Sequence, residues 1–243
     1  TGVRNILVGA LAGDAITDAD FNVAVGYSAL STNALGSRSV AIGDTALNEQ
    51  NPTTATDMYN VAIGFSAGNV VSTGLRNNLI GGFTGDAITT GSDNTAIGHA
   101  ALTNDDLGSK STAVGADALS SLNMTVATDT HNTAVGYQAG VSVSTGIHNT
   151  IIGSIAGDAL TAADYNVALG KGALSTDVRG SRSTALGYEA LFAQNFTTAT
   201  NTNNVAIGYN AGVAVTTGIE NTIVGGLAGD ALTDADYNVA VGK

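Results

Sequence analysis

The chain of 243 residues contains no cysteine and no tryptophan, and it has a single proline. Without cysteine there can be no disulfide bond, no thiol nucleophile and no cysteine-ligated zinc. No apolar run approaches the roughly 20 residues that a membrane helix needs, so we expect no membrane insertion. No signal-peptide pattern is visible either. The scarcity of proline leaves nearly every backbone N–H able to donate in a hydrogen-bonded ladder.

Charged residues are scarce, at 12% of the chain, and their balance is acidic, with 20 Asp and Glu against 8 Lys and Arg. A nucleic-acid-binding protein neutralises phosphates with clustered basic residues. Here the basic residues are scattered along the sequence, at Arg4, Arg38, Arg76, Lys110, Lys171, Arg179, Arg182 and Lys243. With a net charge of −12, we expect no nucleic-acid partner and no attraction to anionic membranes.

Glycine is abundant, with 32 residues, and it marks a repeat. The phrase Asn/Ser-x-apolar-Val/Ile/Leu-Gly occurs fourteen times. Its closing glycines are Gly9, Gly26, Gly43, Gly64, Gly81, Gly98, Gly115, Gly136, Gly153, Gly170, Gly187, Gly208, Gly225 and Gly242. The interval between successive closing glycines is 17 or 21, and three short intervals with one long interval make a larger unit. A fixed short period predicts a solenoid, in which each unit packs only on its neighbours.

The larger units divide the chain into repeats 1–72, 73–144 and 145–216 and a partial repeat, 217–243. We therefore expect residues 1–243 to form a single continuous β-solenoid shaft, without separate domains. Neither end of the sequence resembles a cap, so we interpret it as an excerpt of a longer chain. Fourteen strands at the usual spacing would make a rod about 60 Å long.

Each phrase is typical of a strand whose two faces are both apolar. In the phrase at 204–208, Val205 and Ile207 share one face, while Asn204 and Ala206 share the other. A strand that is apolar on both faces is usually buried on both. We expect the row that contains Ile207 to face the lumen of the solenoid, and another copy of the chain to cover what one thin solenoid leaves bare.

The first position of the phrase is Asn in eleven cases and Ser in three. Stacked Asn side chains can form a hydrogen-bonded ladder along the solenoid, or each can bond its own turn. The phrases therefore supply the residues to which we assign structural roles, which are Asn22, Val25, Gly26, Asn94, Ile97, Gly98, Asn204, Ile207 and Gly208.

The phrases resemble two families of fibrous proteins. The Asn-Thr-Ala-Ile-Gly type of phrase, followed by Ala three residues later, as in 94–101, resembles the head repeats of trimeric autotransporter adhesins. The longer phrases at 132–140 and 204–212 are also similar to repeat arrays of phage tail fibres. The resemblance implies a left-handed parallel β-roll that assembles as a homotrimer, although the adhesin unit is shorter than the unit of this chain.

The sequence offers little that is typical of catalysis or metal binding. The three histidines, His99, His131 and His148, are replaced by other residues in the sister repeats, so we interpret them as exposed surface residues. No Ser-His-Asp spacing and no phosphate-binding glycine motif is present. We therefore expect no enzyme activity and no cofactor. The one weak candidate is calcium, a hard cation that binds oxygen ligands, at the acidic loops Asp14, Asp18, Asp20, Asp230, Asp234 and Asp236.

A four-residue Thr-rich insertion precedes the fourth strand of each repeat. It reads either as a polar loop or as a site of glycan attachment. Asn123-Met124-Thr125 and Asn195-Phe196-Thr197 match the N-glycosylation pattern, whereas proline excludes Asn51-Pro52-Thr53.

Our prediction for function is a structural shaft of an extracellular or virion fibre that projects a binding tip. The expected partner is the chain itself, as a homotrimer that can also stack end to end. The alternative is a trimeric adhesin head that binds a cell-surface glycan or receptor through exposed residues such as Tyr27, Tyr165, Lys171 and Tyr237. A remote alternative is a tailspike-like polysaccharide depolymerase, because a solenoid can carry that chemistry.

Overall fold

The computed structural model describes residues 2–243, and these contain strands and turns but no helix. The fold is a parallel β-solenoid of fourteen turns, each with one three-residue main strand. The prediction of an all-β parallel solenoid is therefore confirmed. The chain divides into two compact units, residues 1–117 with 123–129, and residues 118–122 with 130–243. Each unit is described by itself below.

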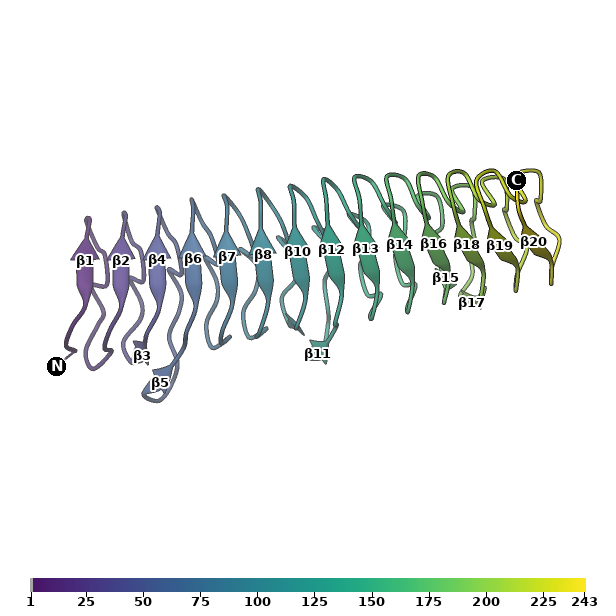
Figure 1. Ribbon diagram of the computed structural model, residues 1–243. Coiled ribbons are helices and arrows are strands. Elements are labelled where there is room, and N and C mark those ends of the chain that lie inside the picture. The colour runs from purple at the N-terminus through teal and green to yellow at the C-terminus, as the bar shows by residue number, and fades with distance from the viewer. Residues whose placement is uncertain (1) are drawn as a thin grey trace. The chain divides into compact units, whose positions relative to one another are not determined.

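Each unit contains seven main strands that pair in parallel with their sequence neighbours (Figure 1). In the first unit they are β1 (Ile6–Val8), β2 (Val23–Val25), β4 (Val40–Ile42), β6 (Val61–Ile63), β7 (Asn78–Ile80), β8 (Thr95–Ile97) and β10 (Thr112–Val114). In the second unit they are β12 (Thr133–Val135), β13 (Thr150–Ile152), β14 (Val167–Leu169), β16 (Thr184–Leu186), β18 (Val205–Ile207), β19 (Thr222–Val224) and β20 (Val239–Val241).

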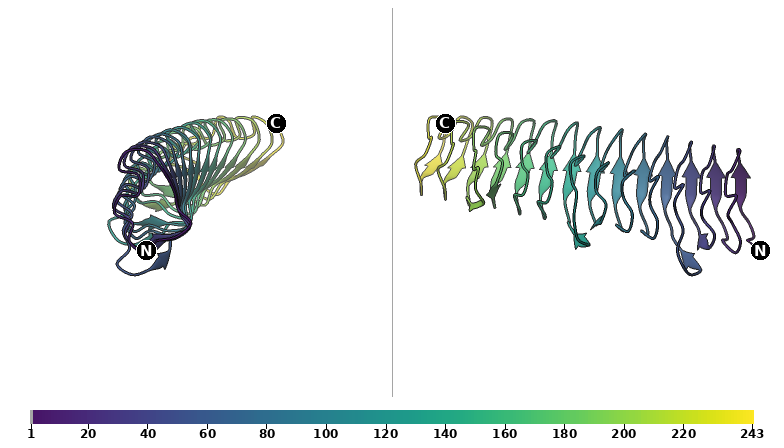
Figure 2. Two further views of the ribbon diagram at one scale, coloured as in Figure 1. Left: turned by 90° about the vertical axis from the view of Figure 1, so that its left-hand side faces the viewer. Right: turned by 180° about the vertical axis from the view of Figure 1, so that it is seen from behind.

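The pairing register places equivalent phrase positions side by side. Val25 pairs with Ile42 in the first unit, and Ile207 pairs with Val224 in the second. Every turn therefore repeats its neighbour about 4.8 Å further on. Seen end-on, the turns of the first unit lie over one another, with the main strands on one side of a flattened loop (Figure 2).

The Thr-rich insertions form short parallel pairs beside the main sheets. These pairs are β3 (Gly36–Ser37) with β5 (Thr56–Asp57), β9 (Gly108–Ser109) with β11 (Thr128–Asp129), and β15 (Gly180–Ser181) with β17 (Thr200–Asn201). The inserted residues thus make a protruding loop whose base is held by a small ladder of its own.

The closing glycine ends each main strand in a conformation that other residues avoid. Gly26, Gly98 and Gly208 have φ of 139°, 134° and 140°. A Cβ on Gly98 would lie 2.6 Å from the carbonyl carbon of Gly115 on the next turn. The backbones of successive turns approach too closely for a side chain, which explains why this position is always glycine.

The lumen is filled from the third phrase position, which is usually alanine. Ala24, Ala96 and Ala206 have no exposed surface, whereas Ile207 is 37% exposed. The prediction that Ile207 and its equivalents face the lumen is therefore wrong. A side chain as small as alanine fits the narrow lumen, and the Val/Ile/Leu row lies on the outer face of the sheet.

A second position, four residues after the closing glycine, also faces the lumen, and it is either leucine or glycine. Four residues after the closing glycine, buried leucines such as Leu47 and Leu102 reach inward from a left-handed backbone, with φ of 47° and 56°. Where the strand carries a large residue instead, this position is glycine. A Cβ on Gly68 or on Gly85 would lie 2.7 Å or 2.8 Å from a methyl group of Leu79. Large and small residues therefore compensate one another from turn to turn.

Buried Asn side chains link successive turns at the start of the main strands. The Asn94 backbone N–H donates to Oδ1 of Asn77 at 3.0 Å, and Oδ1 of Asn94 accepts from the N–H of Ser111 at 2.9 Å. The Nδ2 of Asn94 donates to the Gly108 carbonyl oxygen at 2.9 Å. Asn22 and Asn204 make the same kinds of contact. Each Asn thus binds both the next turn and its own, which combines the ladder and turn roles.

Candidate interaction surface

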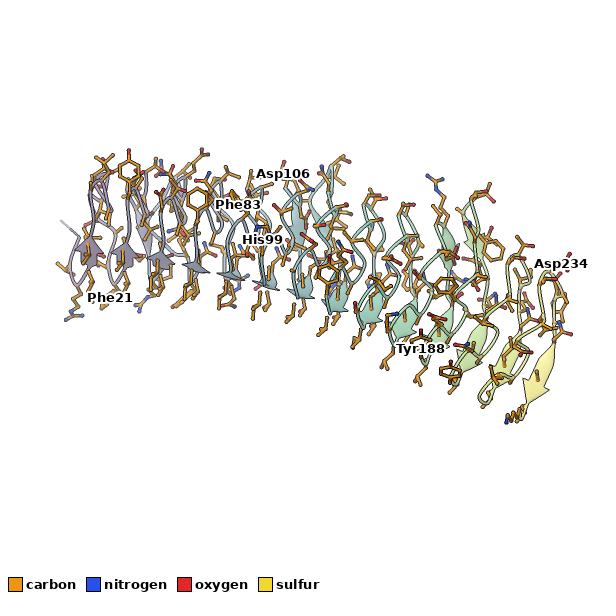
Figure 3. All side chains as sticks on the ribbon, turned by 90° about the horizontal axis from the view of Figure 1, so that it is seen from above. Phe21, Phe83, His99, Asp106, Tyr188 and Asp234 are labelled. Carbon is orange, nitrogen blue, oxygen red and sulfur yellow. The ribbon has the colours of Figure 1, made fainter. Side chains whose placement is uncertain are left out.

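The most distinctive surface of each unit is the outer face of its main sheet. The fourth phrase position forms an outer row of aliphatic side chains, and none of them is buried. In the first unit the outer row is Val8, Val25, Ile42, Ile63, Ile80, Ile97 and Val114. In the second unit it is Val135, Ile152, Leu169, Leu186, Ile207, Val224 and Val241. Carbon-only side chains project from the strands along this face (Figure 3).

A second row lies beside the outer row on the same face. It comes from the second phrase position and is Val, Thr or Ile in all turns except that of Asn78. Between these side chains the outer row stays accessible to water. Ile42, Ile97 and Ile207 of that row are 37%, 39% and 37% exposed. An exposed apolar strip that continues through every turn of a unit is typical of a surface that another molecule covers.

The residues directly before the phrases line up along the side of the sheet where the main strands begin. We name this line of residues the entry column. In the first unit it consists of Arg4, Phe21, Arg38, Tyr59, Arg76, Asp93 and Lys110. In the second unit it consists of His131, His148, Tyr165, Arg182, Asn203, Glu220 and Tyr237. All fourteen have φ between 50° and 66°, a left-handed conformation that is unfavourable for residues other than glycine.

Cations and rings alternate along the entry column of the first unit. The Arg4 guanidinium lies 5.1 Å from the centre of the Phe21 ring, and Arg38 lies 4.8 Å from it on the next turn. Phe21 projects outward from this unit (Figure 3). Arg38 also binds Asp57 at 2.9 Å. Further along, Nε of Arg76 donates to Asp93 at 2.6 Å. Both side chains are exposed, so the pair adds little stability.

These contacts correct the prediction that the basic residues are scattered. Five of the eight stand in the entry column, four in the first unit and Arg182 in the second. The linear sequence hides this alignment. In the first unit the four basic residues stand on alternate turns of one column, with Phe21, Tyr59 and Asp93 between them.

Two of the three histidines also belong to the entry column. The rings of His131 and His148 stack with centres 5.2 Å apart, and Tyr165 stacks on His148 at 5.0 Å. His99 packs edge-on against Phe83, with ring centres 6.0 Å apart (Figure 3). The histidines lie on the surface, as predicted, but they take part in stacks between successive turns.

The residues directly after the closing glycines line up along the side of the sheet where the main strands end. We name this line of residues the exit column. In the first unit it consists of Ala10, Tyr27, Asp44, Phe65, Gly82, His99 and Ala116. In the second unit it consists of Tyr137, Ser154, Lys171, Tyr188, Tyr209, Gly226 and Lys243.

The exit column of the second unit also contains stacked side chains. The Lys171 ammonium lies 5.2 Å from the Tyr188 ring, which stacks on Tyr209 at 5.4 Å. A hydrogen bond to Glu189 raises the pKa of the Tyr188 hydroxyl. The predicted contact set is not brought together, because Tyr27 and Lys171 stand in the exit column but Tyr165 and Tyr237 stand in the entry column.

The acidic loops use some of their carboxylates to bind backbone. Asp20 Oδ1 accepts from the Val3 N–H at 2.7 Å, and Asp236 Oδ1 accepts from the Ile219 N–H at 2.8 Å. Asp14, Asp230 and Asp234 lie at exposed loop positions, and Thr233 donates to Asp234 at 3.1 Å. Asp18 lies on the same loop as Asp14 and Asp20. Among residues 2–243, no three His, Cys, Asp or Glu side chains gather closely enough to hold a metal ion.

Two buried carboxylates occupy equivalent turns but have different partners. Asp177 accepts from the Gly180 N–H at 3.0 Å and from Nε2 of Gln194 at 2.5 Å. Asp105 accepts from the Gly108 N–H at 3.0 Å, but its Oδ2 has no hydrogen-bond partner. Burial raises the pKa of Asp105, and the backbone N–H groups of Met124 and Gly108 oppose that shift.

Loops of the first unit line a polar groove of about 600 Å³. Asp86, Asp106 and Asn123 are among its lining residues, and Figure 3 shows Asp106 on the loop side, opposite the main strands. The Thr103 hydroxyl donates to Asp86, and the Thr89 hydroxyl donates to Asp106. Asn123 and Asn195, the predicted glycan acceptors, are both exposed.

Comparisons with protein-family models, curated proteins and solved structures found no match to this chain. Within residues 2–243 there is also no helix of the length and apolarity that crossing a membrane would require.

Proposed function

We propose that this chain is the structural shaft of an extracellular or virion fibre, a homotrimer of β-solenoids joined through the outer faces of their main sheets. The solenoid is left-handed and continuous over residues 1–243, with super-repeats of four turns each, as in residues 1–72. Its function is mechanical, since a stiff shaft holds a binding tip away from the surface that carries it.

One observation carries this proposal, the outer row. Seven aliphatic side chains in each unit stand in a line, and among them Ile63, Ile97 and Leu169 are 36%, 39% and 40% exposed. Leaving such a strip in water is unfavourable by about 25 cal/mol for each Å² of apolar surface. A partner that covers the strip in every turn must have the same spacing along its length, and another copy of the chain has it.

Three-fold symmetry and the fibre context are supported by the resemblance of the repeated phrases to adhesin heads and tail-fibre arrays. Closed cyclic symmetry also suits a single self-complementary strip, because it leaves no strip uncovered.

The test is to place a charge on the strip in each unit, as the double variant Ile97→Asp/Ile207→Asp. Both side chains reach water in one chain, so the separate solenoid tolerates Asp, whereas an assembled interface would bury an unpaired charge. Light scattering should show an oligomer for the unmodified chain and a folded monomer for the variant. Val126→Asp, on a loop where Val126 is 66% exposed, is the matched control and should remain an oligomer. Unchanged assembly of the double variant would refute the proposal.

A second candidate function is direct binding of a glycan by the groove in the first unit. It is favoured by the hydroxyl, amide and carboxylate groups of Thr103, Asn123 and Asp86 along one hollow. A glycan array probed with the unmodified chain tests it. Asp106→Val should fold, because Val178 occupies the equivalent position in the following repeat, and it should lose the binding that the groove provides.

A further inference from the structure

The apolar strip cannot by itself fix how far one copy is shifted along its neighbour. Its outer row is Val, Ile or Leu in every turn, so a shift by one turn, about 4.8 Å, matches aliphatic residues to aliphatic residues again. A closed ring holds its copies at equal height, whereas a uniform shift makes an open helical array. Less uniform residues can favour the ring over the shifted array. The entry and exit columns are the non-uniform surfaces closest to the strip.

The geometry of a closed ring brings these two columns together. When the sheets of identical copies face a common axis and the strands stack along it, each strand runs around the axis. The end of a strand in one copy then lies next to the start of a strand in the following copy. The exit column of each copy therefore faces the entry column of its neighbour. This step rests on the proposed assembly through the outer face.

At equal height, the columns bring complementary groups together. Arg38 of one copy faces Asp44 of the next. Asp93, which also pairs with Arg76 of its own chain, faces His99, whose ring N–H can donate to it. Asp44 is exposed and has no ion pair within its own chain over residues 2–243. Arg38 uses Nε for Asp57, and its guanidinium has further N–H donors available. In the second unit, the ammonium of Lys171 faces the ring of Tyr165.

A shift by one turn in either direction loses all of these pairs. Asp44 would face Phe21 or Tyr59 in place of Arg38. His99 would face Arg76 or Lys110, whose side chains carry no hydrogen-bond acceptor. In the second unit, Lys171 would face Arg182 or His148. Like charges placed opposite one another are destabilising, whereas opposite charges fix the alignment of an interface.

We infer that the entry and exit columns form the lateral contacts between neighbouring copies and fix them at equal height, through pairs such as Arg38 with Asp44 and Asp93 with His99. The apolar strip then supplies the affinity, and the columns supply the alignment.

Disulfide trapping tests this inference, because the chain has no cysteine of its own. Arg38 and Asp44 are separated by six positions (44 − 38) at the two ends of an extended strand. At about 3.3 Å per residue they lie too far apart for a bond within one chain. Oxidised Arg38→Cys/Asp44→Cys should therefore run as covalent trimers on a denaturing gel. The shifted pairs Arg38→Cys/Tyr27→Cys and Arg38→Cys/Phe65→Cys should run as monomers.

Asp93→Cys/His99→Cys repeats the experiment on a different turn, so that misfolding of one variant does not decide the result. Particles of trimer mass that link only through a shifted pair, or through no pair, would overturn the inference and leave the proposed assembly intact. Particles of monomer mass before oxidation would refute both.

Discussion

At the scale of single residues, the backbone conformation of the entry column is unusual. Arg, Tyr and His residues there adopt a left-handed conformation, which costs roughly 1–2 kcal/mol per residue relative to the right-handed one. The neighbouring Asn ladder and the strand pairing hold each turn in this conformation. Because the strain recurs in every turn, it is a property of the repeat and does not mark one special site.

Asp105 has a buried carboxylate oxygen that lacks a hydrogen-bond donor. Its fully buried Oδ2 has no donor, whereas the equivalent Asp177 receives one from Gln194. In the preceding repeat the residue equivalent to Gln194 is Leu122, which has no hydrogen-bonding side chain. In the first repeat the residue equivalent to Asp105 is Asn33, which bonds both backbone groups of Gly36.

We predict that Asp105→Asn stabilises the protein at neutral pH by about 1–3 kcal/mol, the usual cost of an unsatisfied buried group. The folded-state pKa of Asp105 is raised above its unfolded value, so the folded protein binds this proton more tightly. Stability from this group is therefore present at low pH and is lost as pH rises through the raised pKa. Urea unfolding at pH 4 and pH 7 checks this.

From pH 4 to pH 7, Asp105→Asn should lose less stability than the unmodified chain. Asp177→Asn is the matched control, and it should not be stabilising because it removes the acceptor of Gln194 Nε2. Equal gains from both variants would contradict the explanation.

At the scale of the turn, the lumen depends on matched volumes. Leu79 fills the space that Gly68 and Gly85 leave open on two turns. Six of the turns with alanine in the strand have a leucine four residues after the closing glycine, as at Leu47. The turns of Ala62, Ala134 and Ala206 have glycine there instead. Where both positions are small, as at Ala62 and Gly68, the large side chain comes from the next turn, here Leu79.

We predict that Gly68→Leu is destabilising by several kcal/mol, because its side chain would overlap Leu79. The backbone itself tolerates leucine at this position, since Leu47 adopts the same left-handed conformation. Adding Leu79→Ala should therefore recover a large part of the stability that Gly68→Leu loses. Thermal unfolding of the two single variants and the double variant measures this recovery. Additive losses, without recovery, would show that the two side chains do not share the space.

The period of the solenoid and the positions of its main strands could be predicted from the sequence, because the phrase recurs without exception. The orientation of the strands could not, since Ala206 and Ile207 are both apolar and no polar face distinguishes inside from outside. The useful signal was side-chain size. The strand position becomes Leu or Ile only where glycine follows later in the turn, so that position had to face the filled lumen.

The two columns could not be predicted from the sequence for a different reason. Arg38, Tyr59 and Arg76 share no chemistry, so their alignment shows only when the turns are stacked. Asp105 likewise resembles any other aspartate until its burial and missing donor are known.

At the scale of the whole molecule, each unit has two contrasting surfaces. The loop side is polar and acidic, whereas the sheet side is aliphatic and edged by cations and rings. A soluble protein that keeps both surfaces as a monomer would expose its apolar strip through every turn. Burying the strip in an assembly removes that cost and leaves the polar loops in water.

Native mass spectrometry of the unmodified chain tests this central claim most directly. One chain has a mass of 24.0 kDa, and the proposed homotrimer has three times that mass. The account predicts the trimer at micromolar concentration, with no folded monomer beside it. A soluble, folded species of 24.0 kDa that persists at high concentration would contradict the claim that the outer face is an interface between copies.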